Sequence, residues 1–246
     1  MCNGTIMDKL ISFALPLMLS GMLQLTFNAV DIVVIGQFSG KQSLAAVGAT
    51  TALINVFTNL FIGISLGANV IAARFYAAGR DKEMSETVHT AISLALISGI
   101  VMGIVGIVFS HGALQLMGTP SDVIDLSTLY MRIYFIGMPF FMLYNYGAAI
   151  LRAVGDTKRP LMFLIISGVV NAALNLTLVI GAHLGVAGVA IATVISQMIS
   201  AGLVTICLMK TNASYRLELH KLHIYKDKFF GMMRVGLPAG MQGAVF

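Results

Sequence analysis

Long apolar blocks dominate this 246-residue chain and constrain its fold more than any other feature. A block of roughly 20 apolar residues crosses a bilayer as a helix, because lipid offers no water to unpaired backbone groups. Charged residues make up only 10% of the chain, whereas about a quarter is usual in soluble domains. The sequence therefore predicts an all-α integral membrane protein. We place six complete spans and the start of a seventh, over residues 10–35, 44–73, 89–109, 129–149, 161–181, 186–208 and from 229 onward.

Lysine and arginine are divided unevenly between the two sides of these spans. Most of them lie on one side, which we call the basic side. The opposite side has Lys41, and Arg132 and Arg234 lie near the ends of spans. Because cytoplasmic loops are enriched in these residues, we predict a multi-pass protein of the inner (plasma) membrane with a cytoplasmic N-terminus. The net charge of +5 is then a topology signal, and we expect no nucleic-acid partner. The basic side carries Lys9, Arg74, Arg80, Lys82, Arg152, Lys158, Arg159, Lys210, Arg216, Lys221, Lys226 and Lys228.

The first and seventh predicted spans share a Leu-Pro pair, at Leu15-Pro16 and Leu237-Pro238. An even number of spans separates the two pairs, so both start from the same side, as parallel repeats would. We therefore expect one lobe of a twelve-helix fold plus a stub. Residues 1–209 would form an N-terminal six-helix lobe, 210–228 a cytoplasmic connector, and 229–246 the truncated first helix of a second lobe.

Asp31 is the acidic residue that we place inside an apolar span. A carboxylate at mid-membrane costs on the order of 3 kcal/mol, so it usually faces a cavity or a partner. From the helical rise, Asp31, Asn175 and Thr193 lie roughly 6, 10 and 12 Å below the outer ends of their spans. Asn171 shares a helix face with Asn175. We predict that these four residues form an ion-coupling site, because oxygen donors suit Na⁺ coordination or a proton relay.

Two alternatives to this ion-coupling site stay open. Asp31 would be a solvated carboxylate at the membrane interface if its span ended slightly earlier. The amides and the hydroxyl would then only hold helices together, as polar residues often do in membranes.

Three further residues of the first span are candidates for function. Gln24 and Asn28 share a face with Asp31 at helical spacing, so we predict that they line the same substrate cavity. Pro16 removes one backbone hydrogen bond and permits a bend in the helix. A hinge is the functional interpretation of this proline, and a static kink is the alternative.

The stretch ILRAVGDTKRP follows the fourth span and indicates a cytoplasmic turn. Gly155 permits the bend, Asp156 or Thr157 can cap the next helix, and Pro160 fits the first helical turn. Arg152 and its basic neighbours would hold the loop on the cytoplasmic side. We interpret this motif as architecture or gating rather than chemistry.

The ordered set of motifs resembles the multidrug and toxic compound extrusion (MATE) family over essentially the whole chain, as that family's N-terminal lobe. The resemblance implies an antiporter with two six-helix lobes, which exports drugs or organic cations by alternating access in exchange for Na⁺ or H⁺. It implies no cofactor besides the coupling ion. The motifs are the Leu-Pro pair of the first span, VDIVVIGQFSGKQSLAAVG, LRAVGDTKRP, NAALN and GVAGVAIATVISQ.

The same resemblance assigns roles to individual residues. Asp31 matches the family's carboxylate of the first span, Asn171 its asparagine of the fifth, and Thr193 its threonine of the sixth. Pro16 matches the proline at which the first span bends. Asn175 stands where many members have an aspartate, which leaves the coupling ion open between Na⁺ and H⁺.

Three other functions are compatible with parts of the sequence. A lipid-linked oligosaccharide flippase of the same superfamily would need cations for a pyrophosphate, and the spans offer little beyond Arg132. An intramembrane aspartyl protease would need a second acidic residue in a span beside Asp31, so we do not expect an enzyme. An inactive half-transporter would lack a second lobe, unless two copies pair in parallel and replace it.

Overall fold

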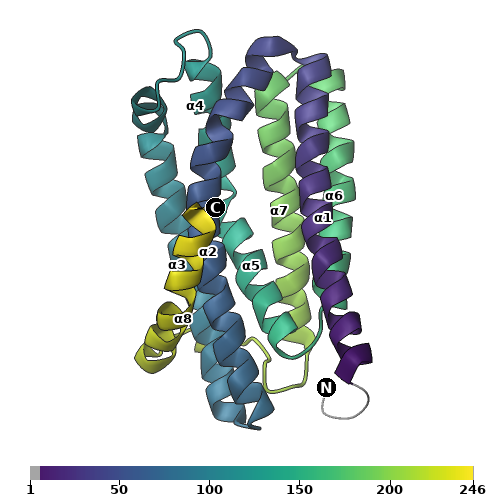
Figure 1. Cartoon of the computed structure of the whole chain (residues 1–246), viewed down its shortest axis with the longest axis vertical. Coiled ribbons are helices and arrows are strands. Elements are labelled where there is room, and N and C mark those ends of the chain that lie inside the picture. The colour runs from purple at the N-terminus through teal and green to yellow at the C-terminus, as the bar shows by residue number, and fades with distance from the viewer. Residues whose placement is uncertain (1–5, 246) are drawn as a thin grey trace.

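The computed structural model describes residues 6–245, and all the regular structure in this range is helical, as predicted. The long helices run side by side as a bundle (Figure 1). In chain order the elements are α1 (Ile6–Phe38), α2 (Gly40–Ala77), α3 (Asp81–Leu116), α4 (Ile124–Ile136), α5 (Met138–Ala153), α6 (Lys158–Asn175), the π-helical segment η1 (Leu176–Gly181), α7 (Gly185–Lys210), the 3₁₀ turn η2 (Leu219–Lys221) and α8 (Lys226–Val245).

Five helical segments are long and apolar enough to cross a membrane, and α4 with α5 makes a sixth if the pair is counted as one span. The five are α1, α2, α3, α6 with η1, and α7; the described part of α8 is not among them. The turn between α2 and α3, the turn between α5 and α6, and the end of α7 lie together at the lower end of Figure 1. The loops that carry the basic residues therefore gather at one end of the bundle.

The predicted fourth span is broken. α4 and α5 meet at Gly137 and are bent by 47°. Pro139 explains the break, because proline has no N–H and its ring excludes the carbonyl of the residue four positions earlier. Helix α3 packs tightly against the break. A Cβ added at Gly99 of α3 would lie 2.5 Å from the Cα of Pro139, which is too close for a side chain. The bend thus depends both on the proline and on a small residue facing it.

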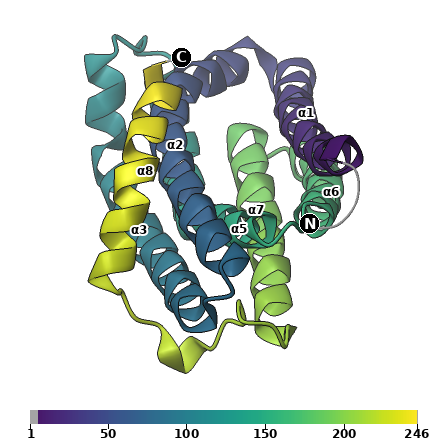
Figure 2. The same ribbon diagram turned by 60° about the horizontal axis from the view of Figure 1, so that its bottom comes forward.

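α8 crosses α2 with the two backbones in direct contact (Figure 2). Each helix contributes two glycines one turn apart, Gly63 and Gly67 on α2 and Gly236 and Gly240 on α8. A Cβ at Gly63 would overlap the Cα of Gly240, and a Cβ at Gly236 would lie 2.5 Å from the Cα of Ile64. Small residues at this spacing allow membrane helices to approach closely. The glycines therefore fix how α8 sits on the bundle.

We predict that Gly63→Ala lowers the midpoint of thermal unfolding in detergent, because the new methyl group must push α8 away from α2. Overpacking of this kind costs about 1–3 kcal/mol. Gly48→Ala on the same helix is the matched control, since nothing lies within 4 Å of a Cβ there. The control is expected to be neutral or slightly stabilising, because alanine favours a helix by about 1 kcal/mol over glycine. Equal midpoints for the two variants would contradict the proposed backbone contact.

Candidate functional site

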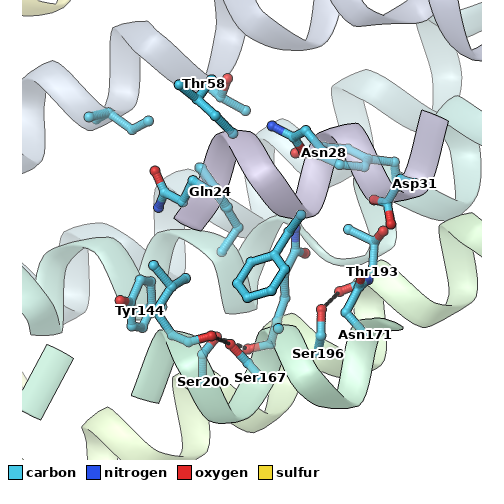
Figure 3. A pocket seen from close by; sticks show the side chains of 18 of the residues that line it. Gln24, Asn28, Asp31, Thr58, Tyr144, Ser167, Asn171, Thr193, Ser196 and Ser200 are labelled. Atoms are coloured by element: carbon cyan, nitrogen blue, oxygen red, sulfur yellow. Dashed lines mark hydrogen bonds between the residues drawn. The ribbon is translucent and has the colours of Figure 1, made fainter. Parts of the chain in front are cut away.

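A cavity of about 500 Å³ lies between α1, α2, α6, α7 and the α4–α5 pair (Figure 3). This is the size of a small-molecule binding pocket. Among the described residues that line it, Asp31 is the one with a charged side chain. Its polar neighbours in the wall are Gln24, Asn28, Asn55, Thr58, Asn59, Tyr130, Tyr134, Tyr144, Ser167, Asn171, Thr193, Ser196, Gln197 and Ser200.

Asp31 is joined to α6 by a hydrogen bond from Asn175, which is itself bonded to Asn171 of the same helix. Asn175 Nδ2 donates to the carboxylate of Asp31, and the same nitrogen donates to Asn171 Oδ1 at 3.1 Å. Asn175 is completely buried behind the cavity wall, and its own Oδ1 has no hydrogen-bond partner. An unsatisfied buried acceptor costs about 1–3 kcal/mol. The Oδ1 atom of Asn175 is therefore a hydrogen-bond acceptor without a donor, on the same amide that donates to Asp31.

Thr193 of α7 lies beside Asp31 and Asn171 at one end of the cavity (Figure 3). Its hydroxyl donates to the backbone carbonyl of Val189 in its own helix at 3.0 Å, which leaves the oxygen lone pairs free toward the cavity. The structure thus brings the four residues of the predicted ion-coupling site together. Three of them line the cavity, and Asn175 supports them from behind.

The two predicted cavity residues of α1, Gln24 and Asn28, both line the cavity. They extend the polar wall from Asp31 along one face of the helix (Figure 3). At the far end of the cavity the wall continues with Tyr144 and Ser200.

A glycine lets α1 approach α6 closely enough for these contacts. The ring of Phe27 occupies the space where a Cβ at Gly168 would lie. Phe27 lies one helical turn before Asp31, and Gly168 lies one turn before Asn171. The packing of this ring on the glycine therefore sets the distance between the carboxylate and the amides.

The helix containing both asparagines changes geometry immediately after Asn175. The prediction was a regular span to residue 181, but Leu176–Gly181 is π-helical, with the N–H of Ala182 donating to the carbonyl of Thr177 at 3.0 Å. The hydroxyl of Thr177 donates to the carbonyls of Ala173 and Leu174, so it competes with the backbone for the usual acceptors. π-helical turns occur frequently at functional sites.

Pro16 is buried inside α1, which continues through it as one helix. The hydroxyl of Ser20 donates to the carbonyl of Pro16 at 2.8 Å. Pro16 lies outside the cavity lining, and its role as a hinge stays a prediction.

The motif around Gly155 forms the turn between α5 and α6. Gly155 has a φ of 89°, a conformation that glycine adopts without strain. The carboxylate of Asp156 accepts the N–H of Arg159 at 3.1 Å, so Asp156 rather than Thr157 caps α6.

Pro160 lies in the first turn of α6, and its carbonyl accepts the hydroxyl of Tyr144 at 3.0 Å. Arg152 lies in the last turn of α5.

Sequence reasoning missed part of the cavity wall. Asn55, Thr58 and Asn59 lie on one face of α2, at spacings of three and four that the sequence shows. Tyr130 and Tyr134 share a face of α4 in the same way and stack with ring centroids 6.2 Å apart. The spacing could have identified both groups as polar stripes within apolar spans.

Apolar helices long enough to cross a membrane, arranged around a polar cavity with one part-buried carboxylate, define an integral membrane protein with a small-molecule-sized site. The family model described as MatE matches residues 16–177. The chain therefore belongs to the MATE family of transporters, as its motifs predicted. Membership excludes the membrane-embedded enzyme, because the proteins of this family are transporters.

Comparison with individual proteins agrees with this assignment. The chain is 33% identical over 238 residues to the "Probable multidrug resistance protein YoeA" of Bacillus subtilis (strain 168), covering 93% of this chain and 51% of that protein. It is 27% identical to the "FAD transporter" of Shewanella oneidensis, over 79% of this chain and 44% of that protein. The chain spans about half the length of these curated relatives.

Solved structures share the fold. A structure described as the outward-facing conformation of a multidrug resistance MATE family transporter of the MOP superfamily aligns with a TM-score of 0.89 and 23% identity. The alignment covers 96% of this chain and 52% of that one.

We predict that Asn175→Leu destabilises the protein more when Asp31 is present than in an Asp31→Leu background. Leucine is close in shape to asparagine but donates no hydrogen bond, so the carboxylate would lose its partner. A double-mutant cycle of unfolding free energies should give a coupling of about 0.5–3 kcal/mol. Asn145→Leu is the control, because Asn145 bonds to Phe141 in its own helix. Additive effects for Asn175 and Asp31 would contradict the contact.

Proposed function

We propose that this chain forms the ion-coupling lobe of a multidrug efflux transporter, which exports drugs or organic cations by alternating access in exchange for Na⁺ or H⁺. The observation that carries the proposal is the carboxylate of Asp31, which is held in a cavity wall by the neutral amide of Asn175. A carboxylate in a membrane that has no lysine or arginine beside it is suited to binding an exchangeable cation.

The donor set supports a single monovalent coupling ion. Asp31 contributes one negative charge, and Asn175 is neutral where many MATE proteins have a second carboxylate. Asn171, Asn175 and Thr193 add amide and hydroxyl oxygens, which are the hard ligands that Na⁺ prefers. These four residues would hold Na⁺, or Asp31 alone would carry the proton in an H⁺-coupled cycle. No further cofactor is part of the proposal.

The cavity wall favours cationic or neutral aromatic substrates. The described lining residues include Asp31 and three tyrosines, Tyr130, Tyr134 and Tyr144, but no lysine or arginine. Tyrosine rings attract cations by their faces, whereas phosphate groups need basic or helix-terminal donors. The wall therefore argues against a lipid-linked oligosaccharide as the substrate. It also argues against anionic dinucleotides, although one relative is named an FAD transporter.

The charge distribution and the length of the chain support a topology. We propose an inner (plasma) membrane location with the N-terminus and the basic loops in the cytoplasm. Because the chain spans about half of its relatives, we propose that residues 1–209 are one lobe, joined by the connector 210–228 to a second lobe that starts at 229. A second copy of the chain paired in parallel is the alternative way to complete the transporter.

We predict that Asp31→Asn in the transporter expressed at full length abolishes efflux of a cationic dye from cells, while its level in the membrane stays unchanged. The control is Asp125→Asn, which removes an exposed carboxylate at the start of α4 and should retain efflux. Proteoliposomes with a Na⁺ gradient at equal pH, or with a pH gradient in Na⁺-free buffer, would identify the coupling ion. Normal dye efflux by Asp31→Asn would overturn the proposal.

A further inference from the structure

The segment between α7 and α8, residues 211–225, is folded onto α3 at the basic end of the bundle. The backbone N–H of Glu218 donates to Nε2 of His89 at 3.1 Å, and the N–H of Tyr225 donates to Oγ1 of Thr90 at 3.2 Å. Leu217 is buried in the core beside these contacts. Figure 2 shows the segment passing from the end of α7 beneath the bundle to α8. It is therefore a docked strap and not a free loop.

The hydrogen bonds of His89 define its protonation state. The ring is 2% exposed, and its Nδ1 lies 2.7 Å from the backbone carbonyl of Ser85. A carbonyl can only accept, so Nδ1 carries a proton. The N–H of Glu218 can only donate, so Nε2 carries none. The docked arrangement therefore requires a neutral imidazole with its proton on Nδ1.

Protonation of His89 would oppose this arrangement. A proton on Nε2 would face the N–H of Glu218, so the hydrogen bond would be lost and two donors would meet. The positive charge would also be buried without a counter-ion in contact with the ring, which is costly. Histidine is the side chain whose change of charge suits a switch near neutral pH.

The two carboxylates near the contact have pKa values shifted toward the charged form. The hydrogen bond from Arg80 lowers the pKa of Glu83, which lies on α3 before His89. The hydrogen bond from Lys221 lowers the pKa of Glu218, with smaller contributions from the charges of His220 and Arg216.

Lys228 at the start of α8 is the buried cation closest in sequence to the strap. Burial acts to lower the pKa of Lys228, but hydrogen bonds and charges from Asp227 and Glu86 outweigh it and raise the pKa. The ammonium lies 3.4 Å from the carboxylate of Glu86 and 4.8 Å from the ring centroid of Phe75. Lys228 thus stays charged and anchors α8 to the same turn of α3 at every physiological pH.

Two other histidines lie on the strap, but neither can act as His89 does. His220 lies 3.3 Å from the carboxylate of Glu218, so its protonation would strengthen an ion pair. His223 is exposed and packs against the ring of Tyr225 at 5.0 Å. His89 is the histidine of this cluster whose neutral form is required for docking.

We propose that His89 is a pH-sensitive latch, which holds the strap 211–225 on α3 while it is neutral and releases the strap when it is protonated. The strap connects α7 to α8, so its release increases the conformational freedom of the residues that join these two helices. On the proposed function this link joins two lobes, and acidification of the cytoplasm would loosen the segment between them while α8 stays seated on α2. The latch itself rests on contacts that do not involve transport.

The first test uses the unmodified chain in detergent. ¹⁵N-histidine NMR at pH 8 should show His89 with a protonated Nδ1 and a bare Nε2. Hydrogen exchange, corrected for the intrinsic effect of pH, should show protection of the Glu218 and Tyr225 amides that falls at least tenfold between pH 8 and pH 5.5. The opposite tautomer at pH 8, or protection that does not change with pH, would overturn the latch.

Two variants separate the latch from general acid sensitivity. His89→Gln retains a side-chain acceptor but does not titrate, so protection of the Glu218 amide should become independent of pH. His223→Gln is the matched control and should keep the dependence of the unmodified chain. Equal pH dependence in both variants would refute the role of His89. None of these measurements depends on efflux, so the latch and the proposed transport activity can fail separately.

Discussion

A bilayer requires every buried polar group to find its partner within the protein, and this constraint sorts the polar side chains of the chain into two kinds. Many hydroxyl groups are satisfied within their own helix. Thr58, Thr193 and Ser200 all donate to backbone carbonyls one turn earlier in their own helices. A carboxylate has no proton to donate and therefore needs a donor from elsewhere. For Asp31 that donor is Asn175 on another helix, so this contact links α1 to α6.

Magnitudes help to decide whether this contact is a site or only a link between helices. A side-chain hydrogen bond between membrane helices contributes about 0.6 kcal/mol on average and rarely more than 2, whereas placing a carboxylate there costs on the order of 3 kcal/mol. The contact therefore does not recover the cost of the charge. The packing of Phe27 on Gly168 already brings α1 and α6 together without any polar group. A structural role alone thus leaves Asp31 unexplained, whereas the exchangeable cation of the proposed function would account for it.

Depth along the membrane could be predicted from the sequence, but lateral neighbours could not. The helical rise placed Asp31, Asn175 and Thr193 at similar depths, and the structure brings them together. The rise does not say which helices are adjacent, so Asn55 and Asn59 of α2 were missed in the cavity wall. The 47° break at Pro139 was not predicted, and it also depends on how closely Gly99 lets α3 approach. No local pattern could reveal that His89 accepts a backbone N–H 129 residues away.

Two contacts of different chemistry hold α8 to the rest of the chain. Its middle is held by glycine backbones on α2, a contact that neither pH nor salt alters. Its first turn is held by Lys228, which lies against Glu86 and Phe75. The strap before it is held by the buried Leu217 and by hydrogen bonds to Thr90 and His89, and the contact with His89 is the one that we propose to depend on pH. Loss of the strap would therefore not detach α8. It would leave the helix seated while removing the restraint on the residues that connect it to α7, so a change of protonation would alter the freedom of the link more than the position of the helix.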